Sequence, residues 1–249
     1  TVLEMMMESL FPNHNYGKQT TIGTVDHLKN PSMKLIREYF DKYYVPNNMA
    51  ICLAGDFDPD QVIKSIDAKF AWMQPKAVEQ YTFTPETDAT APLVREYTGP
   101  DAESVTIGFR LPGVNTQEGM YLQLMNGVLF NRVAGLIDLN LNQQQKVLFA
   151  SSSSWDLKDY CVHILSGRPR QGQSLEEVAN LLLEQIELVK QGKFDESLLK
   201  AVVNNMNVEM IRSNEQNFGR VNTFVGAFIT GANWDETVIR LEKMGTVSK

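Results

Sequence analysis

Apolar positions in the first 44 residues recur at the three- and four-residue spacing of helices. The stretch VLEMMMESLF, residues 2–11, has this spacing and predicts a short helix. Pro12 and Gly17 interrupt the pattern and predict a loop. A second helix is predicted from Asn30, which suits a cap, and Pro31, whose missing N–H costs nothing at the first helical position. Its buried stripe would be Leu35, Ile36, Tyr39, Phe40 and Tyr43.

A continuous apolar run follows, MAICLAG at residues 49–55, and its length suits a central strand covered on both faces. After it, Asp58 and Pro59 repeat the combination of cap and proline and predict another helix. The inward positions of that helix would be Val62, Ile63, Ile66 and Phe70. We therefore interpret residues 1–75 as the closing half of a first α+β domain.

Residues 76–95 lack sustained periodicity and contain many Thr and Pro residues, so we predict a linker. Beyond it, SVTIGFRL at residues 104–111 alternates strictly between apolar and polar positions, as a half-buried strand does. A long helix is predicted over about 116–132. KVLFASSSSW (146–155) and YCVHILSG (160–167) then predict neighbouring strands of one sheet.

The remainder of the chain has helical spacing. Ser174 and Glu177 are separated as in a capping box, and Asp195 suits the cap of the next helix. Two more helical patterns extend to the end of the sequence. Strands followed by helices predict an α+β fold, with helices covering one face of a mainly antiparallel sheet. Residues 96–249 would form most of this second domain.

Composition narrows the class of protein. Hydrophobic residues make up 43% of the 249 positions and charged residues 21%, as in ordinary globular proteins. The net charge of −7, without a strong Lys/Arg cluster, argues against nucleic acid as a partner. No apolar run reaches the roughly twenty residues of a membrane span. The opening TVLEMMMESL lacks the basic start of a signal peptide, and we expect this chain to be a segment of a longer protein.

The two cysteines leave the cellular compartment open. Cys52 and Cys161 lie in apolar runs without CxxC spacing. This placement favours buried free thiols over a disulfide.

Three histidines are the first candidates for chemistry. His14 has no second His or Cys at ligand spacing, and His27 follows Asp26 without an activated Ser or Cys nearby. His163 lies two residues after Cys161 on a predicted strand, so both side chains face one way, but two further zinc ligands are missing. We interpret the three as a loop residue, a surface residue and a core or sheet-face residue.

Motifs of common enzyme classes are absent from the sequence. SSSSW at residues 151–155 has no GxSxG elbow, and neither GxxxxGK[ST] nor GxGxxG occurs. We therefore predict no catalytic, cofactor-binding or metal-binding residues in this chain.

An ordered series of short motifs resembles the insulinase/pitrilysin family of zinc metallopeptidases, which includes the mitochondrial processing peptidase subunits. The series is HNYG (14–17), Gly23, Tyr44, PNN (46–48) and GDFD (55–58). The stretch VTIGFRLPG and the helix predicted after it resemble the start of the next homologous domain, which we expect to be non-catalytic.

The resemblance implies a zinc site made of His-x-x-Glu-His and a distal Glu, with the Glu of the motif as general base. This chain has no His-x-x-Glu-His, and neither Glu4 nor Glu8 fits the distal ligand. Zinc is therefore expected only in the catalytic domain of the parent. Supportive family domains also hold substrate with an Arg and a Tyr, whose places fall near Asn140 and Val147 here.

The resemblance thus implies a non-catalytic segment of a zinc metallopeptidase. Its partners would be the catalytic domain of the same polypeptide and a peptide substrate, which it would help enclose, for instance by lending a sheet edge. The alternative is a region of a peptidase-like scaffold or core subunit that has lost peptidase activity. Homo-oligomerisation, and location in the bacterial periplasm or the cytoplasm, stay open.

Overall fold

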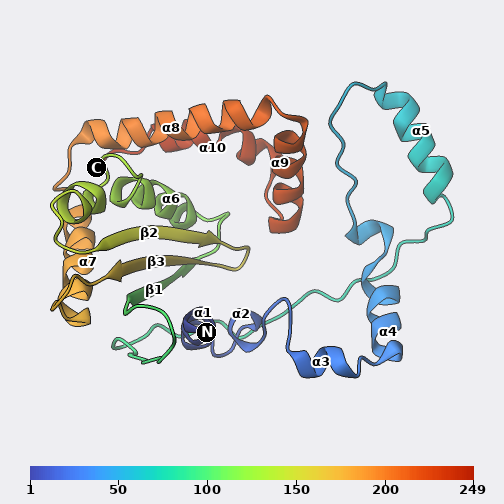
Figure 1. Cartoon of the computed structure of the whole chain (residues 1–249). Coiled ribbons are helices and arrows are strands. Elements are labelled where there is room, and N and C mark those ends of the chain that lie inside the picture. The colour runs from blue at the N-terminus through green and yellow to red at the C-terminus, as the bar shows by residue number, and fades with distance from the viewer. The chain divides into compact units, whose positions relative to one another are not determined.

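The computed structural model describes all 249 residues, which form two compact units. The first unit comprises Leu3–Arg95 with Thr1 and Asn217–Val225. The second comprises Glu96–Gln216 and Gly226–Lys249 with Val2. Figure 1 labels the helices and strands of both.

The first unit contains short helices joined by turns. They are α1 (Val2–Leu10), α2 (Asn15–Lys18), α3 (Val25–Lys29), α4 (Met33–Tyr43), the 3-10 helix η1 (Pro46–Asn48) and α5 (Pro59–Phe70). Asp58 caps α5 and Pro59 opens it, which confirms that prediction. The predicted start of α4 was wrong by two residues, because Ser32 is the cap and its Oγ accepts a hydrogen bond from the Leu35 amide at 3.3 Å. α2 also lies in the stretch expected to be a loop.

The strand predicted at residues 49–55 is not formed. Ile51 and Leu53 are 52% and 50% exposed and lie in backbone without a strand partner. The reason is physical: a central strand needs neighbours on both sides, and the only sheet is built from strands of the second unit.

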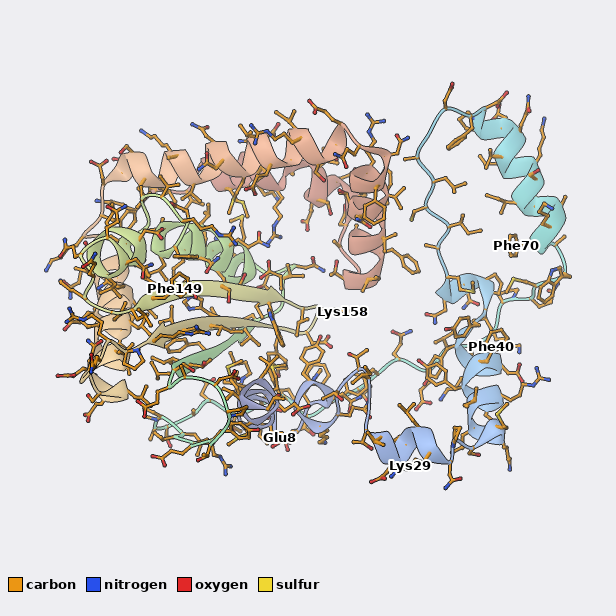
Figure 2. All side chains as sticks on the ribbon, in the orientation of Figure 1. Glu8, Lys29, Phe40, Phe70, Phe149 and Lys158 are labelled. Atoms are coloured by element: carbon orange, nitrogen blue, oxygen red, sulfur yellow. The ribbon has the colours of Figure 1, made fainter.

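The apolar stripe of α4 was also wrongly predicted to be buried. Leu35 is 64% exposed, and Ile36, Tyr39 and Phe40 are at least half exposed. Phe70 on α5 is exposed as well, and Figure 2 labels it together with Phe40. The periodicity correctly predicted the helices, but the residues of this unit provide no layer that covers their apolar faces.

The segment after α5 has no helix or strand, yet side chains fix part of it to the start of the unit. The Glu86 carboxylate accepts hydrogen bonds of 2.8 Å from the backbone amides of Asn13 and His14. The Tyr81 hydroxyl accepts one of 3.0 Å from the Asn15 amide. Residues 81–86 are therefore fastened to the turn before α2, an arrangement that we call the clasp.

The second unit is built on a three-stranded antiparallel sheet, which confirms the α+β prediction. Its strands are β1 (Val105–Pro112), β2 (Phe149–Asp156) and β3 (Tyr160–Arg168), in the order β1-β3-β2. Leu165 of the central strand β3 lies opposite Ile107 of β1 on one side and opposite Ser152 of β2 on the other. β2 is thus an edge strand.

Helices follow the strands, as predicted. They are α6 (Gln117–Leu129), the π-helix η2 (Asp138–Asn142), α7 (Leu175–Lys190), α8 (Glu196–Asn214), α9 (Asn217–Thr230) and α10 (Trp234–Gly245). The capping box of Ser174 and Glu177 is present at the start of α7. Asp195 caps α8 by accepting a hydrogen bond of 2.7 Å from the Ser197 amide.

The second unit has three layers: the sheet, then α6 and α7, then α8 and α10 (Figure 1). The inner core joins the sheet to α6, α7 and η2 through Leu129, Ile137, Leu141, Val147, Ala150, Leu165, Val178 and Leu182. The outer core joins α6 to α8 and α10 through residues that include Leu124, Val202 and Met244. Burial of these side chains is the main force that holds the layers together.

Candidate functional site

A pocket of about 710 Å³ lies beside the edge strand β2. Its lining comes from the end of α6, from η2 and from β2 itself: Phe130, Arg132, Asp138, Asn142, Gln143, Phe149, Ser151, Ser152 and Ser153. All these residues belong to the second unit. We call this site the β2-edge pocket.

The Asn142 side chain ends the hydrogen-bonding edge of β2. Its Oδ1 accepts a hydrogen bond of 2.8 Å from the Ala150 amide, and its Nδ2 donates one of 2.8 Å to the Ala150 carbonyl. An amide side chain thus replaces the next strand at this residue. The pocket lies around this blocked end of β2.

Asp138 shapes the wall that carries Arg132. The Asp138 carboxylate is buried, and its Oδ2 accepts hydrogen bonds from the amides of Asn131 at 3.0 Å and Gly135 at 3.1 Å. This anchors the turn between α6 and η2. Within that turn Arg132 has a φ of 67°, in the left-handed region that costs a residue with a Cβ free energy.

The pocket combines aromatic, hydroxyl and cationic groups. The rings of Phe130 and Phe149 lie edge to face with centroids 6.3 Å apart. Figure 2 labels Phe149 at the start of β2, where its side chain is half exposed. Arg132 is exposed at the wall and takes part in no salt bridge. Such a site can bind a ligand but has no activated nucleophile.

A buried polar network lies behind the pocket. The Ser152 hydroxyl donates a hydrogen bond of 2.7 Å to Asn126 Oδ1 and lies 2.7 Å from His163 Nε2. Because a hydroxyl has one proton, His163 Nε2 then donates to Ser152. Burial lowers the pKa of His163 to about 4, so its imidazole is neutral at pH 7. His163 acts here as a donor and not as a base toward Ser152.

The other candidate histidines have structural roles. His14 is 1% exposed; it caps α2, and its Nδ1 accepts a hydrogen bond of 3.1 Å from the Tyr16 amide. Its ring lies against the rings of Tyr16, Tyr81 and Phe83, with centroids 4.1, 5.2 and 4.4 Å away. His27 is exposed and accepts from the Thr24 amide in a capping box. His14 lies in the turn before α2 and His27 at the surface, in agreement with their interpretations as a loop residue and a surface residue.

Both cysteines are free thiols, but only one is fully buried. Cys161 is buried in the sheet, while Cys52 is partly exposed. Burial, and then the charge of Asp156, raises the pKa of Cys161 to about 11, so it stays a thiol at neutral pH. A thiol in this state is a packing residue and a poor metal ligand.

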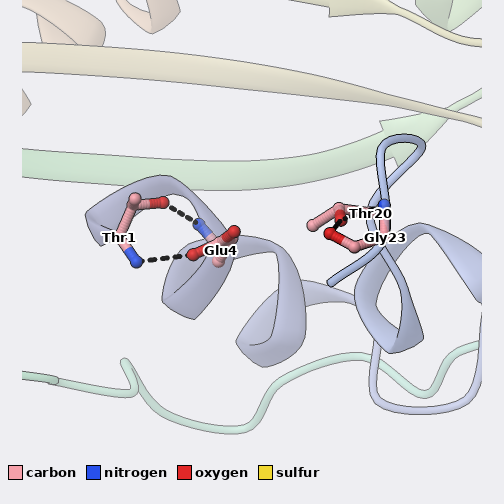
Figure 3. A network of polar contacts seen from close by, with 4 residues as sticks. All are labelled: Thr1, Glu4, Thr20 and Gly23. Carbon is pink, nitrogen blue, oxygen red and sulfur yellow. Dashed lines mark hydrogen bonds and ion pairs between the residues drawn. The ribbon is translucent and has the colours of Figure 1, made fainter. Parts of the chain in front are cut away.

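Glu4 and Glu8 lie on α1. Glu4 forms a capping box with Thr1: its amide donates to Thr1 Oγ1 at 3.3 Å, and its side chain binds the Thr1 nitrogen (Figure 3). Figure 3 also draws the Thr20–Gly23 turn, which is closed by a hydrogen bond of 3.2 Å from the Gly23 amide to Thr20 Oγ1. Glu8 is exposed, and Figure 2 labels it.

Asn140 and Val147 also have structural surroundings. Asn140 Nδ2 donates a hydrogen bond of 2.8 Å to Gln185 on α7. Val147 is buried in the inner core. These contacts hold η2 and the start of β2 against α7.

Zinc does not fit the side chains of this chain. Nowhere do three His, Cys, Asp or Glu residues come together in a group that could hold a metal ion. Zinc sites in proteins need three or four such donors.

None of the helices has the length and apolar content needed to cross a membrane.

The pocket residues Arg132, Asn142 and Phe149 were missed in the sequence. They belong to three separate segments and share no spacing motif, so neither periodicity nor a signature indicates them. Arg132 lies at the end of the helix predicted over about 116–132, and nothing in the sequence there distinguishes it from an ordinary surface residue.

A comparison with models of protein families identifies the family of this chain. Residues 32–206 match the model "Peptidase M16 inactive domain", so the chain belongs to the peptidase M16 family through its inactive domain. This confirms the resemblance to zinc metallopeptidases. Zinc protease PqqE of Helicobacter pylori is 21% identical over 201 residues, which cover 79% of this chain and 45% of that protein.

Solved structures share the fold. A protease from Helicobacter pylori superposes with a TM-score of 0.83 at 18% identity, over 95% of this chain and 58% of the other. A peptidase M16 inactive domain from Pseudomonas fluorescens superposes with a TM-score of 0.78 at 13% identity, over 98% of this chain and 58% of the other. A chain of complex III2 from Candida albicans superposes with a TM-score of 0.73 at 14% identity, over 99% of this chain and 60% of the other. The chain thus spans about half the length of the proteins it matches.

Proposed function

We propose that this chain is a non-catalytic part of a zinc metallopeptidase, which packs against the catalytic domain and helps to enclose a peptide substrate. The observation that carries the proposal is the match of residues 32–206 to the inactive domain of peptidase M16. The zinc protease relative supports a peptidase as the parent protein.

The potential metal ligands of this chain agree with a non-catalytic role. No group of three potential ligands can hold zinc, so the hydrolytic ion would be bound by a different domain. The chemistry that zinc supplies there is activation of a water molecule for attack on the peptide bond. This chain would contribute walls and binding surface.

The exposed apolar faces of the first unit support packing against another domain. Leu35, Ile36 and Phe40 on α4 are exposed together, and so are Ile51 and Leu53 in the extended segment. Exposed apolar side chains grouped on one helix or segment favour burial against a partner. The same residues have the periodicity of core positions.

An association experiment tests this role. The chain and the separately expressed catalytic domain are mixed, and amide hydrogen exchange of the chain is measured. We expect a complex in which residues 33–43 and 49–55 exchange more slowly, and Ile36→Glu should weaken it. Glu38→Gln, on the exposed polar side of α4, is the matched control. No complex, or one unaffected by Ile36→Glu, would contradict the packing role.

A scaffold role is the second candidate, and it is favoured by the fold shared with a complex III assembly. The sequence of the complete polypeptide separates the two. An intact His-x-x-Glu-His with a downstream Glu supports the peptidase, and its absence supports a scaffold or core subunit.

A further inference from the structure

We propose that the β2-edge pocket binds the C-terminal end of an extended peptide. The peptide would pair with the outer edge of β2 and place its last side chain against the aromatic rings of the pocket. Its terminal carboxylate would bind Arg132. The proposal rests on the peptide-enclosing role proposed above and specifies which part of a peptide this chain contacts.

The edge of β2 offers a short ladder with a fixed end. Outward-facing residues alternate along an antiparallel edge strand, and Ala150 is one of them because its amide and carbonyl bind the Asn142 side chain. Ser152 and Ser154 follow at the same period, so their backbone N–H and C=O groups also point to the outer edge, away from β3. An added strand can pair at these two residues but cannot continue past Ala150.

The pocket surrounds the blocked end of this ladder and reaches Ser152, one of the two pairing residues. Asn142, which blocks Ala150, and the adjoining Phe149 are both lining residues. A peptide that pairs with β2 and reaches this point must turn away or end in the pocket.

The charge of the pocket favours an end that bears a carboxylate. Arg132 is exposed and in no salt bridge, whereas the Asp138 carboxylate already accepts two backbone amides. Gln143 Nε2 donates to the Val133 carbonyl at 3.1 Å. Arg132 is therefore the one cationic side chain of the lining, since the buried Asp138 carboxylate is turned toward the backbone of its own turn, and a guanidinium matches the geometry of a carboxylate.

The walls favour an apolar or aromatic last residue. Phe130 and Phe149 present ring edges and faces to the same space, with centroids 6.3 Å apart. The hydroxyls of Ser151 and Ser153 lie on the same wall and can donate to a carboxylate. Carboxylate, hydroxyl and ring contacts together describe a peptide terminus.

Binding of labelled peptides to the 249-residue chain tests the proposal. An N-terminally labelled peptide ending in Phe with a free carboxylate is compared by fluorescence anisotropy with the same peptide amidated. We expect the acid to bind roughly tenfold tighter, because hydrogen bonds to charged groups are the stronger ones. Arg132→Gln should remove this difference, and Arg132→Lys should retain part of it. Arg170→Gln, an exposed arginine outside the pocket, is the matched control.

Two further results decide the matter. An amidated peptide with an internal Glu must bind no better than the plain amide; if it equals the acid, a side chain and not a terminus is recognised, and the proposal is overturned. Equal binding of acid and amide, or an unchanged preference in Arg132→Gln, overturns it as well. Circular dichroism checks that each variant is folded. The assay needs no catalytic domain, so the association experiment above can succeed while this one fails.

Discussion

The guanidinium of Arg240 on α10 donates a hydrogen bond of 2.9 Å to the backbone carbonyl of Val114, in the loop after β1. It also binds Gln123 Oε1 on α6 at 3.3 Å. Gln123 Nε2 in turn donates a hydrogen bond of 2.7 Å to Asp156 Oδ2 at the end of β2. This network ties the outer helical layer to the sheet.

Replacing Arg240 should loosen the second unit. Arg240→Met keeps an unbranched apolar stem but leaves the Val114 carbonyl without its charged donor, and we expect a loss of roughly 2 kcal/mol in the free energy of unfolding. Urea unfolding followed by far-UV circular dichroism measures it. Arg212→Met, at an exposed position near the end of α8, is the control. Equal stability of the two variants would contradict the role given to Arg240.

The stability of the second unit should depend on pH through His163. Its pKa is lowered by burial to about 4 in the folded chain, against about 6.5 in the unfolded chain. The unfolded state therefore binds the proton first. The contribution of His163 is complete above pH 6.5 and is lost as pH falls toward 4, by roughly 2–3 kcal/mol at pH 4.5.

The variant His163→Asn isolates this effect from carboxylate titration. The difference in unfolding free energy between pH 7 and pH 4.5 should be smaller in His163→Asn than in the parent chain. If the two proteins lose the same stability on acidification, His163 is not buried as a neutral imidazole.

Gly17 should tolerate no side chain. A Cβ at this position would lie 2.6 Å from the Met7 carbonyl oxygen and closer still to that of Phe11. Because both obstacles are backbone atoms, Gly17→Ala should destabilise the first unit by about 1–3 kcal/mol. Gly226→Ala in α9 meets nothing within 4 Å and should be neutral or stabilising. Thermal unfolding of both variants gives the comparison, and a harmless Gly17→Ala would refute the packing of this turn.

The clasp should open when Glu86 is removed. Glu86→Ala deletes the acceptor of the Asn13 and His14 amides, so both amides should exchange with solvent faster. Glu79→Ala removes an exposed carboxylate that pairs with Lys42 at 2.6 Å, and it should leave these amides unchanged. Unaltered exchange in Glu86→Ala would mean that the clasp does not hold the turn.

Local chemistry was predictable from sequence, and burial in the first unit was not. The caps at Asp58, Ser174 and Asp195 were found because each depends on residues within one helical turn. The predicted strand at 49–55 failed because a strand is completed by neighbours that this chain does not place beside it. The same limit explains the exposed stripe of α4.

The pocket escaped prediction for a related reason. Arg132 and Asn142 meet Phe149 only because η2 folds back against the edge of β2. No periodic pattern in the sequence predicts the contact between η2 and β2. Sequence motifs did identify the family, since they are local features of turns and helix ends.

Zinc content and peptide hydrolysis, measured in parallel on the 249-residue chain and on the complete polypeptide, show whether the hydrolytic site lies outside this chain. We predict that the chain alone binds no stoichiometric zinc and cleaves no peptide, whereas the complete polypeptide contains zinc and cleaves peptides in an EDTA-sensitive reaction. One zinc ion per isolated chain, with EDTA-sensitive cleavage by that chain, would contradict it.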